Sequence, residues 1–211
     1  MSFFDGVYAG GKAVYGEGPD AFLAGHLPLE RLRTALDAGG GEGRHALWLA
    51  RRGVEVELID ASAAAVERVG ARARAEGLPL TACMADLRSW EPERVYDAVL
   101  AAIVLHAFKV ERAADVAARL RRAVAPGGYL YLSVHVAGGE EERMRRAEGQ
   151  DERAERTFFG NAHIKTLFTE DEVLAMAAWE PVAVERAAGE RCPRADCPYP
   201  HDVLRLLTRQ P

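Results

Sequence analysis

Hydrophobic and polar residues alternate along this chain in a pattern of short apolar runs separated by longer segments of helical period. The apolar runs predict strands, at residues 34–38, 54–60, 80–84, 96–101, 129–135, 182–186 and 203–208. The segments between most of these strands predict helices. Strands that alternate with helices are typical of a parallel sheet covered on both faces, so the pattern predicts an α/β fold.

The predicted helices carry recognisable start and stop signals. Residues 62–76 are rich in alanine and begin at a serine, which is a favourable N-cap residue. Residues 42–52 and 110–124 repeat apolar residues on one side, and the second of these helices should stop before a turn at residues 126–128. A capping box that begins at Thr169 opens a further helix.

Two segments do not fit this repeating unit. Residues 1–33 precede the first strand, and residues 139–156 are a dense run of Glu and Arg. Alternating charges of this kind are typical of a solvated helix held by ion pairs, which is the interpretation that the run favours. The alternative is a mobile lid over a binding site.

Composition and charge narrow the class of protein. A chain of 211 residues is long enough for one domain with a full core and too short for two ordinary catalytic domains. The formal net charge of −5 disfavours a nucleic-acid partner, because phosphate contacts depend on clustered Lys and Arg. We see no signal-peptide pattern or membrane-length apolar stretch and expect a cytoplasmic protein without membrane contact. Three cysteines, an odd number, do not suit a disulfide framework.

The strongest local signal is a glycine-rich segment, residues 36–44, between the first strand and the first long helix. Its sequence is Leu-Asp-Ala-Gly-Gly-Gly-Glu-Gly-Arg. Gly39, Gly41 and Gly43 lack the Cβ atoms that keep a ligand away from the main chain, and they permit the dihedral angles of a tight turn. We therefore predict that this segment cradles a ligand.

Three carboxylates accompany the glycines. Asp60 ends the second strand, where a Rossmann-type site accepts hydrogen bonds from ribose hydroxyls. Asp86 follows the third strand and can accept from an adenine amino group while Leu87 packs on the ring. Asp37 precedes the glycines and can pair with a ligand ammonium group. Together with the glycines, these residues favour a nucleoside-type ligand over a plain structural turn.

The spacing of the glycines argues against a dinucleotide. Counted from Gly39, the pyrophosphate fingerprint G-x-G-x-x-G would place its third glycine at Arg44. The P-loop sequence G-x-x-x-x-G-K-[ST] is also absent from the chain. Both observations disfavour a site built for a pyrophosphate or triphosphate group.

Residues 37–43, Asp60 and residues 85–87 resemble, in this order, the first motif, the ribose acid and the adenine motif of the class I S-adenosylmethionine-dependent methyltransferases. Residues 96–100 are similar to the fourth strand of that family, and residues 126–130 to the turn into its fifth. The resemblance implies a Rossmann-like three-layer sandwich. Its seven-stranded sheet is mostly parallel and has an antiparallel last strand.

This resemblance also implies a cofactor, a reaction and a division of the chain. The cofactor is S-adenosylmethionine, whose methyl group passes to a small-molecule acceptor by in-line displacement. We expect a single domain over residues 1–211, with an N-terminal cap (1–33), a cofactor-binding core (34–136) and an acceptor-side half (137–211). The predicted cofactor-binding residues are Asp37, Gly39, Gly41, Gly43, Asp60, Ala61, Asp86, Leu87 and Ala102. The alternatives are an NAD(P)-dependent or nucleotide-sugar oxidoreductase and a noncatalytic adenosylmethionine-binding protein.

Other short sequences are similar to one branch of the family, the small-molecule enzymes related to tellurite-resistance and thiopurine methyltransferases. They lie at residues 15–23, 41–50 and 167–172. Many members of that branch have Asn where this chain has His45.

Displacement at a sulfonium depends more on alignment and exclusion of water than on a general base. Ligands of open α/β sheets sit outside the carboxyl ends of the strands, which favours side chains that follow strands. The candidates for a catalytic role are His106, His135, Tyr8 and Tyr15. A structural role is the favoured interpretation for His106 and His135, and equally for His45, His163 and His201, so the sequence leaves the catalytic residue open.

Cys192, Cys197 and His201 have a spacing that resembles a set of metal ligands. A structural zinc ion needs four ligands, and only an aspartate between the cysteines or a distant histidine can complete this set. We therefore predict an ordered, proline-rich loop and no metal. This loop, residues 191–201, and the N-terminal segment through Phe22 are expected to cover the open end of the sheet. The alternative is that the aromatic side chains of these segments fill the core.

Overall fold

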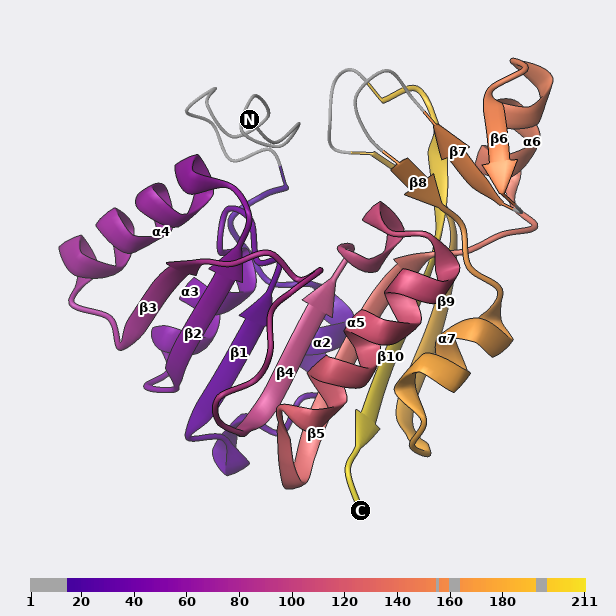
Figure 1. Ribbon diagram of the computed structural model, residues 1–211. Helices are drawn as coiled ribbons and strands as arrows, with labels where there is room; N and C mark the ends of the chain where they lie inside the picture. Colours follow the sequence, from indigo (N-terminus) through magenta and orange to yellow (C-terminus); the bar gives the residue numbers. More distant parts are fainter. Residues whose placement is uncertain (1–14, 155, 160–163, 193–196) are drawn as a thin grey trace.

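The computed structural model describes residues 15–154, 156–159, 164–192 and 197–211, and its main feature is a seven-stranded sheet (Figure 1). The strand order is β3-β2-β1-β4-β5-β10-β9. The bounds are β1 (Thr34–Ala38), β2 (Glu55–Asp60), β3 (Leu80–Met84), β4 (Tyr96–Ala102), β5 (Val124–His135), β9 (Pro181–Arg191) and β10 (Pro200–Arg209). Every strand predicted from the sequence is present.

The directions of these strands confirm the predicted fold class. The strands β1 to β5 run parallel to one another. The last strand, β10, runs antiparallel to both β5 and β9 and lies between them. The sheet is therefore mostly parallel with an antiparallel last strand, as in a Rossmann-like methyltransferase fold.

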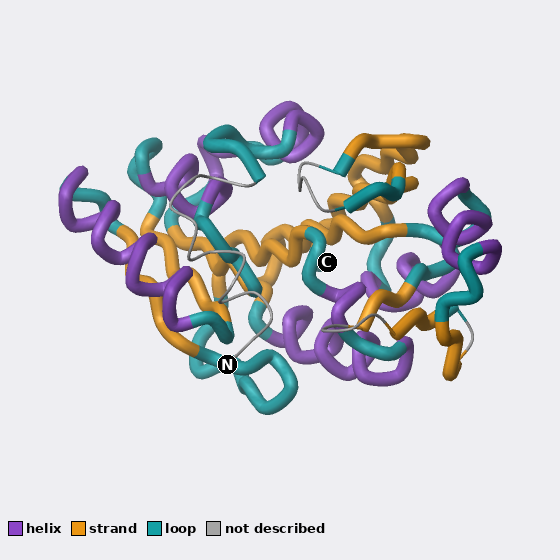
Figure 2. Tube along the Cα trace, turned by 90° about the horizontal axis from the view of Figure 1, so that it is seen from above, coloured by secondary structure: helices purple, strands orange, loops and turns teal. Residues whose placement is uncertain are grey.

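Helices cover both faces of the main sheet, as Figure 2 shows from above. The helices of the described residues are α2 (Ala21–His26), α3 (Arg44–Ala50), α4 (Ala63–Glu76), α5 (Val110–Arg122), α6 (Glu140–Ala147) and α7 (Glu170–Ala177), with 3-10 turns η1 (Leu29–Arg31) and η2 (Leu105–Ala107). One apolar core lies under α5 and α7 and includes Leu120 and Val173. A second core lies under α2, α3 and α4 and includes Leu23, Leu49 and Val69. In the part of the chain that the structure describes, every helix is too short or too polar to cross a membrane.

The structure differs from the prediction at the start of β5. The sequence predicts a turn at residues 126–128 before the strand, whereas β5 already begins at Val124. Its pairing with β4 shifts between Val124 and Tyr129, so residues 126–128 form an irregularity inside the strand. Proline has no N–H to donate to a neighbouring strand, which accounts for the interruption.

The segment 139–156 is only partly the predicted solvated helix. Its helix, α6, carries the expected kind of ion pair between Arg146 and Glu142, at 2.9 Å. The neighbouring residues Glu141 and Arg145 are buried instead and pair at 2.8 Å. The rest of the segment enters a small sheet that the sequence did not predict, formed by β6 (Asp151–Ala154), β7 (Thr157–Phe159) and β8 (Ile164–Thr166). This sheet lies at the end of the main sheet where the parallel strands terminate (Figure 1).

The N-terminal segment contributes to the core. In α2, Phe22 and Leu23 are buried, and the Phe22 ring lies 6.3 Å from that of Tyr131, centroid to centroid. The expectation that Phe22 covers the open end of the sheet is therefore wrong, because its apolar area is buried in the second core. Tyr8 lies outside the described residues, as does His163.

Candidate functional site

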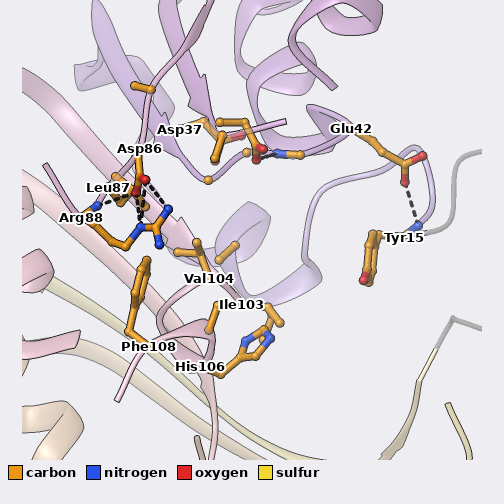
Figure 3. Close-up of a pocket in the computed structure, with 18 of the residues that line it drawn as sticks. Tyr15, Asp37, Glu42, Asp86, Leu87, Arg88, Ile103, Val104, His106 and Phe108 are labelled. Atoms are coloured by element: carbon orange, nitrogen blue, oxygen red, sulfur yellow. Dashed lines mark hydrogen bonds and ion pairs between the residues drawn. The ribbon is translucent and has the colours of Figure 1, made fainter. Parts of the chain in front are cut away.

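A cavity of about 520 Å³ lies at the carboxyl ends of the parallel strands (Figure 3). We call it the larger cavity, because a smaller one lies beside it. Every predicted cofactor-binding residue except Gly43 lines the larger cavity. The lining residues of that set are Asp37, Gly39, Gly41, Asp60, Ala61, Asp86, Leu87 and Ala102. They stand at the ends of β1 to β4 or directly after them, so the parallel sheet gathers positions that are far apart in the sequence.

Gly43 is the exception. It is the N-cap residue of α3 and has a φ of 75°, in the left-handed region. A Cβ atom at this position would lie 2.8 Å from Cγ2 of Val69 in α4. The glycine therefore serves the close packing of α3 against α4.

Gly39→Ala is expected to destabilise the protein more than Gly53→Ala. The two glycines have φ values of 67° and 83°, so both substitutions carry the strain of a left-handed residue, roughly 1–2 kcal/mol. At Gly39 the new Cβ would also lie 2.9 Å from Cβ of Val104, whereas the surroundings of Gly53 are open. Overpacking adds about 1–3 kcal/mol at Gly39 alone. Thermal denaturation measures the difference, and an equal loss of Tm in both variants would contradict this packing.

Asp37 is a buried carboxylate with one oxygen left for a ligand. Its Oδ2 accepts a hydrogen bond from the N–H of Ala46 at 3.1 Å. Its Oδ1 has no hydrogen-bond partner among the described residues, and the side chain lines the larger cavity. Burial raises the pKa of Asp37 to about 7. A cationic group placed beside Oδ1 would satisfy this oxygen and stabilise the charged carboxylate.

Asp60 is held in place by the backbone. Its Oδ2 accepts from the N–H of Gly41 at 2.9 Å, and its Oδ1 accepts from the N–H of Ser62 at 2.8 Å. Each carboxylate oxygen can accept more than one hydrogen bond. The contacts therefore orient the carboxylate at the cavity wall, where the sequence predicted a partner for ribose hydroxyls.

Asp86 forms an ion pair that the sequence did not indicate. Its Oδ2 lies 2.5 Å from Nη2 of Arg88, and its Oδ1 also accepts from the backbone N–H of Arg88 at 2.9 Å (Figure 3). The Arg88 guanidinium holds the pKa of Asp86 below its usual value. Arg88 therefore competes for the carboxylate that was predicted to accept from adenine.

Several lining residues were not predicted, among them Ile103, Val104 and Phe108. Ile103 has a φ of 52°, which is unusual for a β-branched residue, and its N–H donates to the carbonyl of Ser133 at 2.8 Å. Its place directly after a predicted strand was a usable signal. Phe108 precedes α5, and only the tertiary fold brings it to the cavity.

His45 also lines the larger cavity. Its Nε2 accepts a hydrogen bond from the N–H of Asp20 at 3.3 Å. Burial lowers the pKa of His45 to about 3, so the ring is neutral at physiological pH. A neutral acceptor that ties α3 to the start of α2 agrees with the structural role favoured for this histidine.

A smaller cavity of about 180 Å³ adjoins the larger one, because Tyr15, Arg44, Ile103 and His106 line both. Two of the catalytic candidates, Tyr15 and His106, thus stand where the two cavities meet. His135, the remaining candidate among the described residues, lines the smaller cavity.

Three histidine rings stack along the smaller cavity. The centroid distances are 5.1 Å from His106 to His135 and 4.1 Å from His135 to His201. Beside them lies the buried carboxylate of Glu141, 3.5 Å from Nζ of Lys165. His201, for which the sequence favoured a structural role, therefore belongs to a polar cluster at a cavity.

The chain also matches known proteins in sequence. Residues 35–128 match the model of a methyltransferase domain. A trans-aconitate 2-methyltransferase of Methylobacterium radiotolerans is 39% identical over 119 residues, which are 55% of this chain and 43% of that protein. The chain spans less than half the length of the curated relatives it matches.

Similarity of fold extends over most of the chain. An S-adenosylmethionine-dependent methyltransferase from Methanosarcina mazei has a TM-score of 0.72 at 17% identity and covers 92% of this chain and 98% of its own. TehB from Haemophilus influenzae also has a TM-score of 0.72 at 17% identity, with 92% and 63% covered. Identities this low show the fold alone. The matched domain and the shared fold agree with the predicted resemblance to S-adenosylmethionine-dependent methyltransferases.

Proposed function

We propose that this protein transfers the methyl group of S-adenosylmethionine to a small-molecule acceptor. The methyltransferase domain and the cavity at the ends of β1 to β4 support this reaction. When bound, S-adenosylmethionine supplies an activated methyl group. The residues of the chain hold donor and acceptor in line and exclude water from them.

The single observation that carries the proposal is the buried carboxylate of Asp37, a residue of the cavity wall whose Oδ1 has no hydrogen-bond partner among the described residues. An isolated buried carboxylate is costly, and an ammonium group of the ligand would offset that cost through a charge-assisted hydrogen bond. The pyrophosphate of a dinucleotide would instead bring more negative charge to this carboxylate. The electrostatics therefore favour a nucleoside that carries an amino-acid moiety over NAD(P).

In this proposal, the other predicted residues bind different parts of the cofactor. Asp60 receives the ribose hydroxyls, and Asp86 and Leu87 bind the adenine ring. Because Arg88 already pairs with Asp86, adenine binding requires Arg88 to share or release that carboxylate. The glycines at 39 and 41, with Ala61 and Ala102, keep the walls of the cavity close to the ligand.

The smaller cavity supports the choice of acceptor. Its volume of about 180 Å³ suits a small molecule, and its lining mixes cationic Arg44 and Lys165 with the histidines. The net charge of −5 continues to disfavour a nucleic-acid acceptor. A cytoplasmic location is part of the same proposal.

A turnover assay tests the proposal. The protein is incubated with S-adenosylmethionine and a panel of thiols, amines, phenols and oxyanions, and the adenosylhomocysteine formed is measured. We expect formation above the acceptor-free rate with at least one small molecule. Adenosylhomocysteine binding without turnover on any acceptor would favour the noncatalytic alternative, and binding of NAD instead would favour the oxidoreductase.

His106→Ala is expected to slow methyl transfer by roughly 100-fold or more while the affinity for adenosylhomocysteine changes little. His106 is buried where the two cavities meet, a position from which it can orient an acceptor or take its proton. Single-turnover rates and equilibrium titration measure the two effects. The control is His26→Ala, on the exposed side of α2, which should match the wild type. A normal rate in a folded His106→Ala protein would remove this histidine from the acceptor site.

A further inference from the structure

The structure brings Cys192, Cys197 and His201 together at the smaller cavity. Cys192 follows the end of β9 and Cys197 precedes the start of β10, so the antiparallel pairing of these strands returns both cysteines to the same place. One ligand atom from each of the three residues lies within 4.8 Å of the others. All three line the smaller cavity.

The distances within this cluster suit a metal ion. Sγ of Cys197 lies 3.5 Å from Nε2 of His201. In a tetrahedral zinc site with bonds of about 2.3 Å to sulfur and about 2.05 Å to nitrogen, the sulfur and nitrogen ligands are about 3.6 Å apart. The two atoms therefore need little movement to share one zinc ion.

A second, independent observation concerns the other side of the His201 ring. Its Nδ1 lies 2.6 Å from Oε2 of Glu141, a buried carboxylate contributed by α6. With the Nδ1 proton held by Glu141, the Nε2 lone pair faces Cys197. A carboxylate that orients a histidine in this way is typical of metal-binding histidines.

Lys165 distinguishes this cluster from the other possible ligand set nearby. The atoms of His135, Glu141 and His201 also lie close together, within 4.8 Å. However, Nζ of Lys165 stands 3.5 Å from Glu141 and also contacts Nδ1 of His135. An ammonium group there repels a cation, so the cysteine side of His201 is the favourable side.

We propose that Cys192, Cys197 and His201 bind a zinc ion through three protein ligands and leave its fourth coordination position open to the smaller cavity. Two thiolates and one imidazole are donors that zinc prefers. From the sequence, no metal was expected because a fourth ligand was missing. Three protein ligands are sufficient where water or a substrate completes the coordination. The contact of Glu141 with His201 could not be foreseen, because the two residues lie far apart in the sequence.

The proposed zinc site lies at the smaller cavity, which adjoins the larger one. Tyr15, Arg44, Ile103 and His106 line both cavities, so a group bound to a zinc ion in the smaller cavity would lie in the space that adjoins the proposed cofactor site. The ligands that fit this position are water and small anionic groups. The metal site itself does not depend on methyl transfer, and its test needs no turnover.

The test measures the metal directly. The whole protein is purified without chelator, and its zinc content is determined by inductively coupled plasma mass spectrometry. We expect about one zinc ion per chain. Replacement by cobalt should give the thiolate-to-cobalt charge-transfer band and the visible bands of a tetrahedral site. Protein that stays metal-free after incubation with zinc chloride and gives no such bands would overturn the proposal, as would a Cys192–Cys197 disulfide that persists in protein purified with a reductant.

Variants assign the ligands. Cys192→Ser and Cys197→Ser should lose the zinc ion, whereas Cys83→Ser, on the exposed strand β3, should keep it. Glu141→Gln should weaken zinc affinity by about 10–100-fold in a chelator competition, because it loosens the orientation of His201. If a cysteine variant does not fold, the cobalt spectrum of the wild type still shows whether thiolates bind the metal. Wild-type zinc affinity in a folded Cys197→Ser protein would contradict the assignment.

Discussion

Replacing Asp60 with alanine is expected to weaken adenosylhomocysteine binding by about two orders of magnitude or more. In the proposed site this carboxylate receives two ribose hydroxyls through charge-assisted hydrogen bonds, each of which contributes about 1.5–3 kcal/mol. Every 1.4 kcal/mol corresponds to about a tenfold change in Kd. Isothermal titration of the purified variant measures the loss.

The stability of the fold must be separated from this loss of affinity. The Asp60 carboxylate also accepts from the N–H groups of Gly41 and Ser62, so the alanine variant is expected to lose some thermal stability as well. Asp60→Asn keeps the size of the side chain and one acceptor oxygen. Asp115→Ala, which removes a carboxylate that is 62% exposed on α5, is the matched control. Unchanged affinity in a folded Asp60→Asn protein would remove Asp60 from the ribose site.

Asp37→Asn is expected to weaken adenosylhomocysteine binding by about 10- to 100-fold while it stabilises the free protein above neutral pH. The amide loses the charge-assisted contact to the ligand ammonium, at about 1.5–3 kcal/mol. The amide is neutral at every pH, so the variant also avoids the free-energy cost of burying a negative charge. Titration calorimetry gives the affinity, and thermal denaturation from pH 4 to pH 8 gives the stability.

Linkage between proton binding and folding gives the pH dependence of that stability. Burial raises the pKa of Asp37 from 3.8 in the unfolded chain to about 7, so the folded state binds more protons than the unfolded state between these values. The destabilisation is therefore absent below about pH 4, grows as the pH rises and is complete above about pH 7. At about 1.4 kcal/mol per pKa unit it is on the order of 4 kcal/mol. A stability difference between wild type and variant that does not change with pH would contradict this account.

Most of the main sheet was predictable because its signals are local. Each strand is a short apolar run, and the Ser62 cap of α4 and the capping box of α7 act within one helical turn. The small sheet of β6 to β8 has no such signal, since its strands have three or four residues each. The bulge at the start of β5 was missed because the same residues, 126–128, suit a turn equally well.

The residues of the two cavities also differ in how far the sequence predicts them. The residues of the larger cavity follow strands whose carboxyl ends meet at one edge, so strand prediction alone places Asp37, Asp60 and Asp86 together. The ion pair of Arg88 with Asp86 was not apparent, because spacing alone does not tell which side chain an exposed arginine will meet. At the smaller cavity, the contact between Glu141 and His201 joins residues 60 positions apart, and only the packing of α6 on β10 creates it.

Calorimetric titration of the protein with adenosylhomocysteine and, separately, with NAD at neutral pH tests most directly whether the larger cavity is an S-adenosylmethionine site. The Oδ1 of Asp37 and the shifted glycine spacing both favour a ligand with an ammonium group and without a pyrophosphate. We predict saturable binding of adenosylhomocysteine and none of NAD. Binding of NAD with no response to adenosylhomocysteine would contradict the assignment of this site to S-adenosylmethionine.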